Sequence, residues 1–317
     1  MTIRRIGFVL IDGYAMLSTA AALDPLRAAN SFAGRDLYDV RILTPEGTLA
    51  TSSLGARFDA IPLAEAGMAF DLVFVVAGGD PMRLRLPALD TWLRRADRAG
   101  VELGGISGGA VLLARAGLLE GRRFTVHWHH YDDIAHIDPT LLLERKLFVI
   151  DRDRYTCAGG SAPLDMIHML IARDHGARFA HEISDWFIQA QVRPSETPQK
   201  SSIAARYGAL PPMVEAALEL MEAHIADPLS PAQLADLAGL SERQLQRQFN
   251  ATLGAPVMEI YRHMRLDVAR ALVQRSALPL SEIAQMTGFA SQAHFTTRYG
   301  ARFGTPPQAD RSHVQKR

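Results

Sequence analysis

Residues 103–110, Leu-Gly-Gly-Ile-Ser-Gly-Gly-Ala, constrain the fold of this 317-residue chain more than any other stretch. An apolar run leads into them and an Ala/Leu-rich helical pattern follows, so they are predicted to form a strand, a sharp turn and a helix. Small residues crowd a single hydroxyl, that of Ser107, into the turn. Such a turn presents one side chain at a helix N-terminus, beside free backbone N–H groups.

The first two hundred residues alternate short apolar runs with helical patterns, which indicates a parallel sheet covered by helices on both faces. This α/β arrangement is that of a flavodoxin-like sandwich, in which ligands bind beyond the carboxyl ends of the strands. Glycines mark three strand ends, at residues 78–79, 105–109 and 159–160. They would let a ligand approach the backbone, although ordinary turn glycines would look the same. Strands are expected at residues 6–11, 38–44, 71–77, 101–106 and 155–158, with extended segments at 124–127 and 147–151.

The letters of residues 105–109 also fit G-x-S-x-G, the turn that carries the nucleophile of serine hydrolases. The histidine-rich stretch at residues 127–130 lies only twenty residues beyond Ser107, and the later histidines lack a triad context. Adjacent residues of a strand point in different directions, and no carboxylate or cysteine completes a ligand set, so no metal site is predicted. The one cysteine, Cys157, excludes an intrachain disulfide.

Four features follow one another in an order that is known from another family. They are a strand that ends in Asp-Gly, a helix that carries Asp24, the Ser107 turn and residues 116–128. This order resembles the PfpI-type, class I glutamine amidotransferase-like fold, in the form found in GlxA-type transcription regulators. Enzymes of that superfamily use a cysteine at the turn, a histidine from the next strand and a glutamate from the first helix. By position these fall on Ser107, His127 and Asp24. Serine needs a well-placed base where cysteine is intrinsically nucleophilic, so the resemblance implies a sensor pocket without enzymatic activity or cofactor.

The expected ligand is an amino acid or a quaternary amine, the effector class that the resemblance implies. The turn would bind a carboxylate of the ligand, and Asp12 and Asp24 would bind a cationic group. Trp128 or Tyr14 could stack on a quaternary ammonium or pack in the core instead. The alternative function is an amidase or esterase that uses Ser107 and His127. The predicted ligand contacts are Asp12, Asp24, Gly79, Ser107, Gly108, His127 and Trp128.

Residues 194–212 are polar, proline-marked and free of apolar periodicity, so a linker is expected between domains at 1–193 and 213–317. Beyond it, residues 229–241 and 280–291 repeat one pattern: a capping serine (Ser230 or Ser281), a short apolar helix, a glycine turn and a second capping serine. That is the spacing of a helix-turn-helix. A long amphipathic helix at residues 257–275 separates the two copies.

This all-α region resembles the AraC/XylS-type DNA-binding domain down to residues 303–307, after which Ala309-Asp310 replace the usual Tyr-Arg. The resemblance implies a homodimeric regulator, an activator by expectation, that reads tandem major-groove half-sites on double-stranded DNA; contact with RNA polymerase is compatible with it. Arg262, Arg265 and Arg302 are candidate phosphate contacts or plain surface residues. The predicted base-facing residues are Arg243, Gln246, Arg247, Ser291, Gln292, Thr296, Thr297 and Arg298.

Whole-chain charge does not bear on DNA binding, because 34 Lys and Arg balance 34 Asp and Glu. No run approaches the ~18 consecutive apolar residues of a membrane span. The chain begins with a predicted strand rather than a signal peptide, so no membrane association and a cytoplasmic location are expected.

Overall fold

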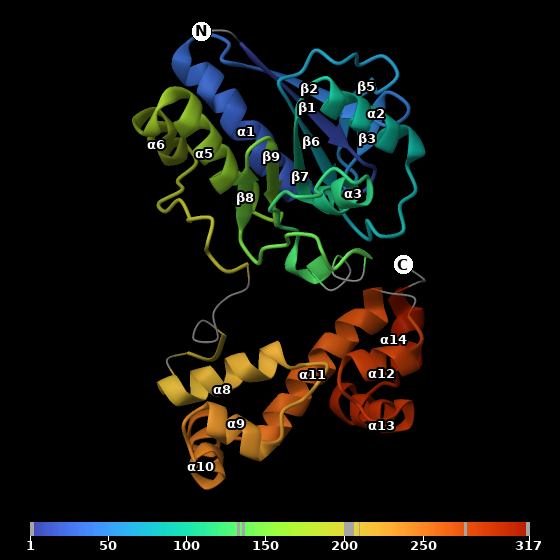
Figure 1. Cartoon of the computed structure of the whole chain (residues 1–317), viewed down its shortest axis with the longest axis vertical. Coiled ribbons are helices and arrows are strands. Elements are labelled where there is room, and N and C mark those ends of the chain that lie inside the picture. The colour runs from blue at the N-terminus through green and yellow to red at the C-terminus, as the bar shows by residue number, and fades with distance from the viewer. Residues whose placement is uncertain are drawn as a thin grey trace. The chain divides into compact units, whose positions relative to one another are not determined.

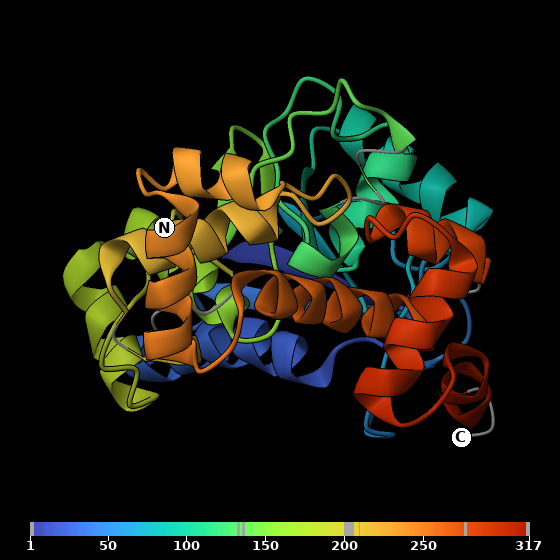
Figure 2. The same ribbon diagram turned by 90° about the horizontal axis from the view of Figure 1, so that it is seen from below.

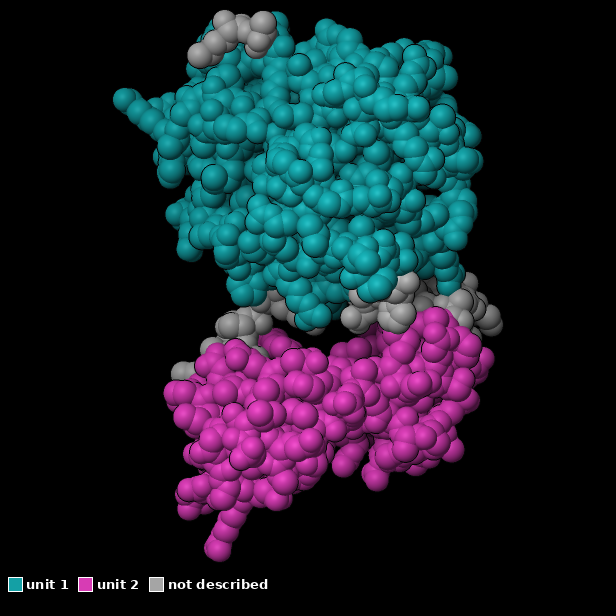
Figure 3. All heavy atoms as spheres, in the orientation of Figure 1, with its two compact units in different colours: residues 1–200 teal, residues 201–317 magenta. Residues whose placement is uncertain are grey.

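The computed structural model describes residues 3–131, 134, 137–199, 206–208, 210–275 and 278–314. The chain divides into two compact units, Met1–Lys200 and Ser201–Arg317 (Figure 3). Residues 200–205 and 209 of the expected linker lie outside the described residues. Residues 194–199 contact the first unit, where the carbonyl of Ser195 accepts the N–H of Leu147 at 2.8 Å.

The first unit is built on a seven-stranded sheet with the strand order β5-β2-β1-β6-β7-β9-β8. All pairings are parallel except that of β8 with β9, so the carboxyl ends of the central strands share one edge. A separate hairpin joins β3 (Leu49–Thr51) and β4 (Arg57–Asp59). The strands of the main sheet are β1 (Arg4–Leu10), β2 (Tyr38–Thr44), β5 (Ile61–Pro62), β6 (Leu72–Ala77), β7 (Glu102–Ser107), β8 (Phe148–Asp151) and β9 (Arg154–Cys157).

Helices cover both faces of this sheet, as Figure 1 shows. One layer holds α1 (Met16–Ala33), α5 (Ala162–His175) and α6 (Ala177–Trp186), and the other holds α2 (Pro87–Arg98) and α3 (Gly109–Arg115). The strands alternate between two cores, so that Phe8 and Phe74 pack toward the first layer and neighbouring valines toward the second. The predicted α/β sandwich is confirmed.

One predicted extended segment takes a different form. At residues 124–127 the structure has an isolated bridge between Phe124 and Leu143, followed by the short 3-10 helix η1 (Trp128–His130). Thr125 bonds through its N–H to the Thr156 hydroxyl of β9, at 2.9 Å, instead of forming a backbone ladder.

The second unit is helical, and its two halves repeat one another. α9 (Pro231–Leu237) and α10 (Glu242–Leu253) form the first helix-turn-helix, and α12 (Leu280–Met286) and α13 (Gln292–Phe303) form the second. The remaining helices are α8 (Pro212–Ala223), α11 (Val257–Arg275) and α14 (Pro307–Val314). Each half has its own apolar core, and α11 contributes to both (Figure 2). The predicted duplicated helix-turn-helix architecture is confirmed.

Serine caps begin three of these helices. Ser230 and Ser241 form capping boxes with Gln233 and Gln244, in which each side chain bonds the other residue's backbone N–H. Ser291 accepts the N–H of His294 at 3.2 Å. The prediction for Ser281 is wrong, because α12 begins two residues earlier than a Ser281 cap implies, at Leu280, with Pro279 at the N-cap and no side-chain cap.

Candidate functional site

The turn at Ser107 is strained in the way that a sharp strand-to-helix turn requires. Among the described residues, the non-glycine residues with a positive φ are Ser107, Arg152 and Ile188, and Ser107 has a φ of 56°. An L-residue in this left-handed region costs roughly 1–2 kcal/mol. The conformation sets Ser107 at the end of β7, two residues before α3 begins.

Glycines let the surrounding backbone close around this turn. A Cβ on Gly109 would lie 1.9 Å from the carbonyl oxygen of Val75, and one on Gly105 would lie 2.5 Å from the backbone of Ala110. A Cβ on Gly159 would lie 2.6 Å from the Ser107 Cβ and 2.9 Å from its hydroxyl oxygen. The glycine after β9 therefore leaves the space that the Ser107 side chain occupies.

The end of β6 joins the same edge. A Cβ on Gly78 would lie 2.4 Å from the carbonyl oxygen of Gly13, while one on Gly79 would meet nothing within 4 Å. Gly108 donates its N–H to the carbonyl of Ala77, at 3.0 Å, and a Cβ on Gly108 would lie 3.0 Å from the side chain of Pro81, so this glycine is packed against the fold. The three glycine-marked strand ends therefore lie along one edge of the sheet.

Cys157 lies opposite Ile106 in the pairing of β9 with β7, and Ile106 is the residue before Ser107. Its side chain is fully buried, and burial raises the pKa of the thiol to about 12. A thiol with this pKa is protonated at neutral pH, so Cys157 does not supply the thiolate that Ser107 lacks.

Each of the two acidic candidates has a polar partner in the first unit. Asp12 follows β1 and accepts the N–H of Thr51 at 2.9 Å. Asp24 lies on α1 and forms an ion pair with Arg27, three residues later, with its side chain 46% exposed. Tyr14 is fully buried and packs against Phe58 with 6.3 Å between ring centroids, so of its two expected roles the structure shows core packing.

His127 and Trp128 open the 3-10 helix η1. The Nδ1 atom of His127 accepts the N–H of His129 at 3.2 Å, so in the neutral ring the hydrogen is on Nε2. The His127 and Trp128 rings lie 5.2 Å apart between centroids. The backbone N–H of Trp128 donates to Oε1 of Gln199 at 2.7 Å. Sequence reasoning missed Gln199, because a lone glutamine in a polar segment carries no pattern.

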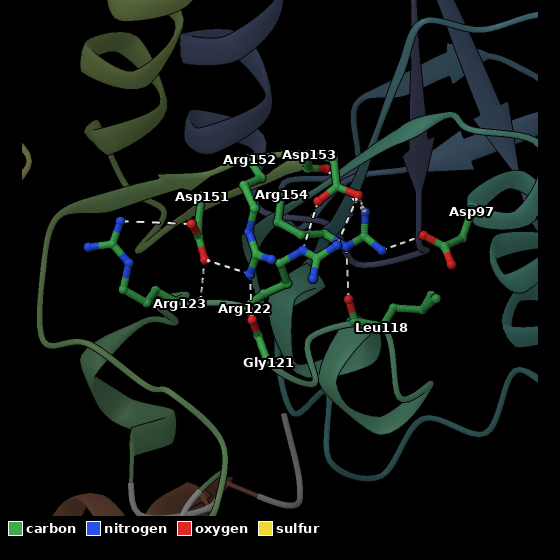
Figure 4. Close-up of polar contacts among 9 residues, drawn as sticks. All are labelled: Asp97, Leu118, Gly121, Arg122, Arg123, Asp151, Arg152, Asp153 and Arg154. Atoms are coloured by element: carbon green, nitrogen blue, oxygen red, sulfur yellow. Dashed lines mark hydrogen bonds and ion pairs between the residues drawn. The ribbon is translucent and has the colours of Figure 1, made fainter.

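A network of arginines and aspartates lies near the start of β9 (Figure 4). Arg154 is buried and bonds Asp97, Asp153 and the carbonyl of Leu118. A hydrogen bond from Arg122 lowers the pKa of the Asp153 carboxyl. Since Arg154 pairs with Leu103 near the start of β7, this network stabilises the edge opposite Ser107.

The helix-turn-helix units each present one polar helix face. On α10, Leu245 and Phe249 are buried, whereas Arg243 and Arg247 are exposed. Gln246 donates to Asn250 on the same face at 2.9 Å. Arginine and amide side chains are the groups that read guanine and adenine edges in the major groove. Asn250 is a candidate that the sequence analysis omits.

On α13, Phe295 and Tyr299 are buried, and the predicted residues Gln292, Thr297 and Arg298 are exposed. Arg298 contacts the ring of His294, with 3.3 Å between its Nε and Nε2 of the histidine. Three candidates on this helix have a local partner or less exposure: the Ser291 hydroxyl caps the helix, the exposed Thr297 donates to the carbonyl of Ala293, and Thr296 is half-buried.

Two of the candidate phosphate contacts have partners within the second unit. Arg265 donates to the carbonyls of Thr287 and Gly288 and lies 4.4 Å above the Phe289 ring. Arg302 forms a two-pronged ion pair with Asp267, at 2.8 Å. Arg262, which is half-buried, stays a candidate.

Asp310, which departs from the expected Tyr-Arg ending, anchors α14. It accepts hydrogen bonds from Tyr299 at 2.6 Å, Arg270 at 3.0 Å and Gln274 at 3.2 Å. Burial opposes ionisation of this carboxyl, but the hydrogen bonds from Tyr299, Gln274 and Arg270 lower its pKa. The substitution therefore brings its own partners from α11 and α13.

Comparison with known proteins agrees with both units. The DJ-1/PfpI family model matches residues 4–173, and a helix-turn-helix domain model matches residues 234–313. The HTH-type transcriptional regulator GlxA of Rhizobium meliloti is 43% identical over 96% of this chain and 94% of its own length. The chain belongs to the GlxA-type transcriptional regulators.

Two further similar proteins match most or part of the chain. The HTH-type transcriptional regulator CdhR of Pseudomonas aeruginosa is 38% identical over 96% of this chain and 90% of its own length. An AraC family transcriptional regulator from Pseudomonas putida has a solved structure with 28% identity and a TM-score of 0.54. It covers 58% of this chain and 99% of its own. The protein is therefore an AraC-type regulator with a PfpI-like domain. No helix in the described part of the chain is long and apolar enough to span a membrane.

Proposed function

We propose that this GlxA-type regulator is an effector-responsive activator, and that the space in front of Ser107 binds a small amino acid or quaternary amine. The observation that carries the proposal is the strained backbone of Ser107 at the carboxyl edge of the sheet, with Gly159 packed against its side chain. Strained backbone is retained where surrounding structure over-determines it, which is typical of ligand sites. Trp128 supplies an aromatic face for an ammonium group.

Binding rather than catalysis is the role favoured by the contacts of His127 and Asp24, the two residues that would have to activate Ser107. An alcohol nucleophile needs a base that accepts its proton. His127 uses Nδ1 to accept the N–H of His129, which leaves the neutral ring with a donor at Nε2. The carboxylate of Asp24 is paired with Arg27. The protein is on this account not an enzyme and carries no cofactor.

A serine-directed fluorophosphonate tests the enzymatic alternative. We expect no adduct at Ser107 by mass spectrometry after treatment of the full chain, with a known serine esterase as the positive control. Stoichiometric adduct at Ser107 that disappears in Ser107→Ala would establish an activated nucleophile and overturn the purely sensory role.

DNA recognition is assigned to the exposed faces of α10 and α13. Arg243, Gln246 and Arg247 would read bases, while the poorer set on α13 would add backbone contacts. A homodimer acting in the cytoplasm, in contact with RNA polymerase, is the working form that we propose for an activator.

Selection of bound duplexes from a random DNA library tests this assignment. The full chain should enrich a site with two recognised segments separated by about one helical turn, roughly 34 Å. Retention of DNA without sequence enrichment, at a salt concentration where non-specific binding is screened, would contradict it.

A further inference from the structure

The segment between α6 and the second unit lies along the first unit rather than apart from it. We call residues 188–199 the strap; it follows α6 in Figure 1. Its first anchor is Arg193, which donates to the fully buried carboxylate of Asp165 at 2.6 Å and to the Ser161 hydroxyl at 2.9 Å. Its second anchor is the carbonyl of Ser195, which accepts the N–H of Leu147.

The third anchor is the side chain of Gln199, and it uses both ends of its amide. Nε2 donates toward the carbonyls of Lys146 at 2.6 Å and Val126 at 2.9 Å and the hydroxyl of Thr125 at 3.1 Å. Oε1 accepts the N–H of Trp128 at 2.7 Å. Among common side chains only an amide of this length offers donors and an acceptor in this arrangement.

The backbone groups that bind Gln199 belong to the segment that carries His127 and Trp128, two residues of the proposed effector site. Thr125 and Val126 lead directly into His127, and Thr125 is bonded to Thr156 of β9, one residue before Cys157. Gln199, which accepts the backbone N–H of Trp128, is also the last described residue of the first unit. One glutamine therefore connects the site to the chain that leads to the DNA-binding unit.

We propose that Gln199 is the positioning residue that couples effector occupancy to the strap. The inference rests on the proposed function, because it needs a ligand beside His127 and Trp128. A ligand that contacts Trp128 and holds its backbone N–H against Oε1 of Gln199 stabilises the hydrogen-bonded position of Gln199. Linkage is reciprocal, so a variant that loses the Gln199 hydrogen bonds must bind the ligand more weakly by the same factor.

Two variants and one control separate this coupling from simple loss of stability. Gln199→Glu places carboxylate oxygen against the carbonyls of Val126 and Lys146, and Gln199→Met keeps the length but removes every hydrogen bond. Glu196→Gln is the control, since it changes an exposed residue of the same strap whose contact with Lys146 is 3.7 Å long.

Hydrogen exchange of the full-length protein, without ligand, is the first readout. Exchange of the Trp128 and Leu147 amides should rise at least about fivefold in both Gln199 variants, the factor expected for one lost hydrogen bond, and stay unchanged in Glu196→Gln. Equal exchange at Leu147 in all four proteins would overturn the inference, because the strap would then be held without Gln199.

Ligand binding is the second readout, with glycine betaine and L-arginine as the probes. The probe that raises the melting temperature of the wild type should slow Leu147 exchange at least about fivefold, and should bind both Gln199 variants more weakly by a similar factor. A probe that binds but leaves Leu147 exchange unchanged would overturn the coupling and leave the proposed function standing. If neither probe binds, these two compounds are excluded as effectors, and the ligand-free exchange decides the role of Gln199.

Discussion

Ser107 and Gly159 share one small space at the carboxyl edge of the sheet. A Cβ on Gly159 would lie 2.6 Å from the Cβ of Ser107 and 2.9 Å from its hydroxyl oxygen. Ser107 ends β7, and Gly159 follows β9, its neighbour in the sheet. The site that we propose is therefore formed by two strands, and its shape depends on a residue more than fifty positions from the serine.

Gly159→Ala should destabilise the first unit by more than Gly160→Ala. Both glycines have a positive φ, 93° and 58°, so both alanine variants strain the backbone. A Cβ meets Ser107 only at Gly159, whereas at Gly160 it meets nothing within 4 Å. We expect the added overlap to cost about 1–3 kcal/mol in chemical denaturation. Equal free energies of unfolding for the two variants would show that the Ser107 side chain moves aside freely.

Ser107→Gly should be more stable than Ser107→Ala by roughly 1 kcal/mol. Glycine adopts a φ of 56° without steric cost, whereas alanine keeps the penalty of the left-handed region. Both variants lose the hydroxyl, so the difference reports the backbone alone. An alanine variant as stable as the glycine variant in urea unfolding would mean that the turn relaxes once the hydroxyl is removed.

Asp310→Asn should weaken the attachment of α14 and change the acid sensitivity of the second unit. The carboxylate accepts from Tyr299 and Arg270, and losing charged hydrogen bonds of this kind costs about 1.5–3 kcal/mol. Its folded pKa is lowered, so its stabilisation is complete above the unfolded pKa of about 3.9 and is lost as pH falls through the folded value.

Hydrogen exchange of the α13 amides in the full chain measures both effects. The wild type should lose protection relative to Asp310→Asn as the pH falls below about 4, after correction for intrinsic exchange. A constant difference between the two proteins from neutral to acidic pH would contradict the ionised role of Asp310.

Arg247→Ala should weaken binding to the selected DNA site by about 1–3 kcal/mol, because a bidentate contact with guanine is worth that much. Arg178→Ala is the control, since this arginine lies on α6 with its side chain 94% exposed. Fluorescence anisotropy on the selected site and on unrelated DNA measures the difference. The same loss on both duplexes would make Arg247 a phosphate contact instead.

The sequence predicts those features that repeat or have a fixed local pattern. The two helix-turn-helix units carry serine caps, glycine turns and apolar spacing, so their arrangement follows from adjacent residues. The turn at Ser107 is likewise set by its own glycines. These elements are determined by short-range steric and hydrogen-bonding requirements, which a single sequence displays.

Long-range polar contacts escape that reasoning. Gln199 bonds residues more than fifty positions away, and Arg265 bonds the carbonyls of Thr287 and Gly288. Nothing near either residue in the sequence identifies its partners, because most of the partners are backbone groups and carry no side-chain signal. For the same reason Arg265 looks like a surface phosphate contact until its tertiary partners are seen.

Calorimetric titration of the full chain with a panel of amino acids and quaternary amines tests the central claim most directly. The three proteins to compare are the wild type, Gly160→Ala and Gly159→Ala, which differ in whether a methyl group enters the space beside Ser107. We predict that one ligand binds the wild type and Gly160→Ala with equal affinity. Its affinity for Gly159→Ala should be at least about tenfold lower, a difference of roughly 1.4 kcal/mol. Equal affinity for all three proteins would place the effector elsewhere and contradict the account.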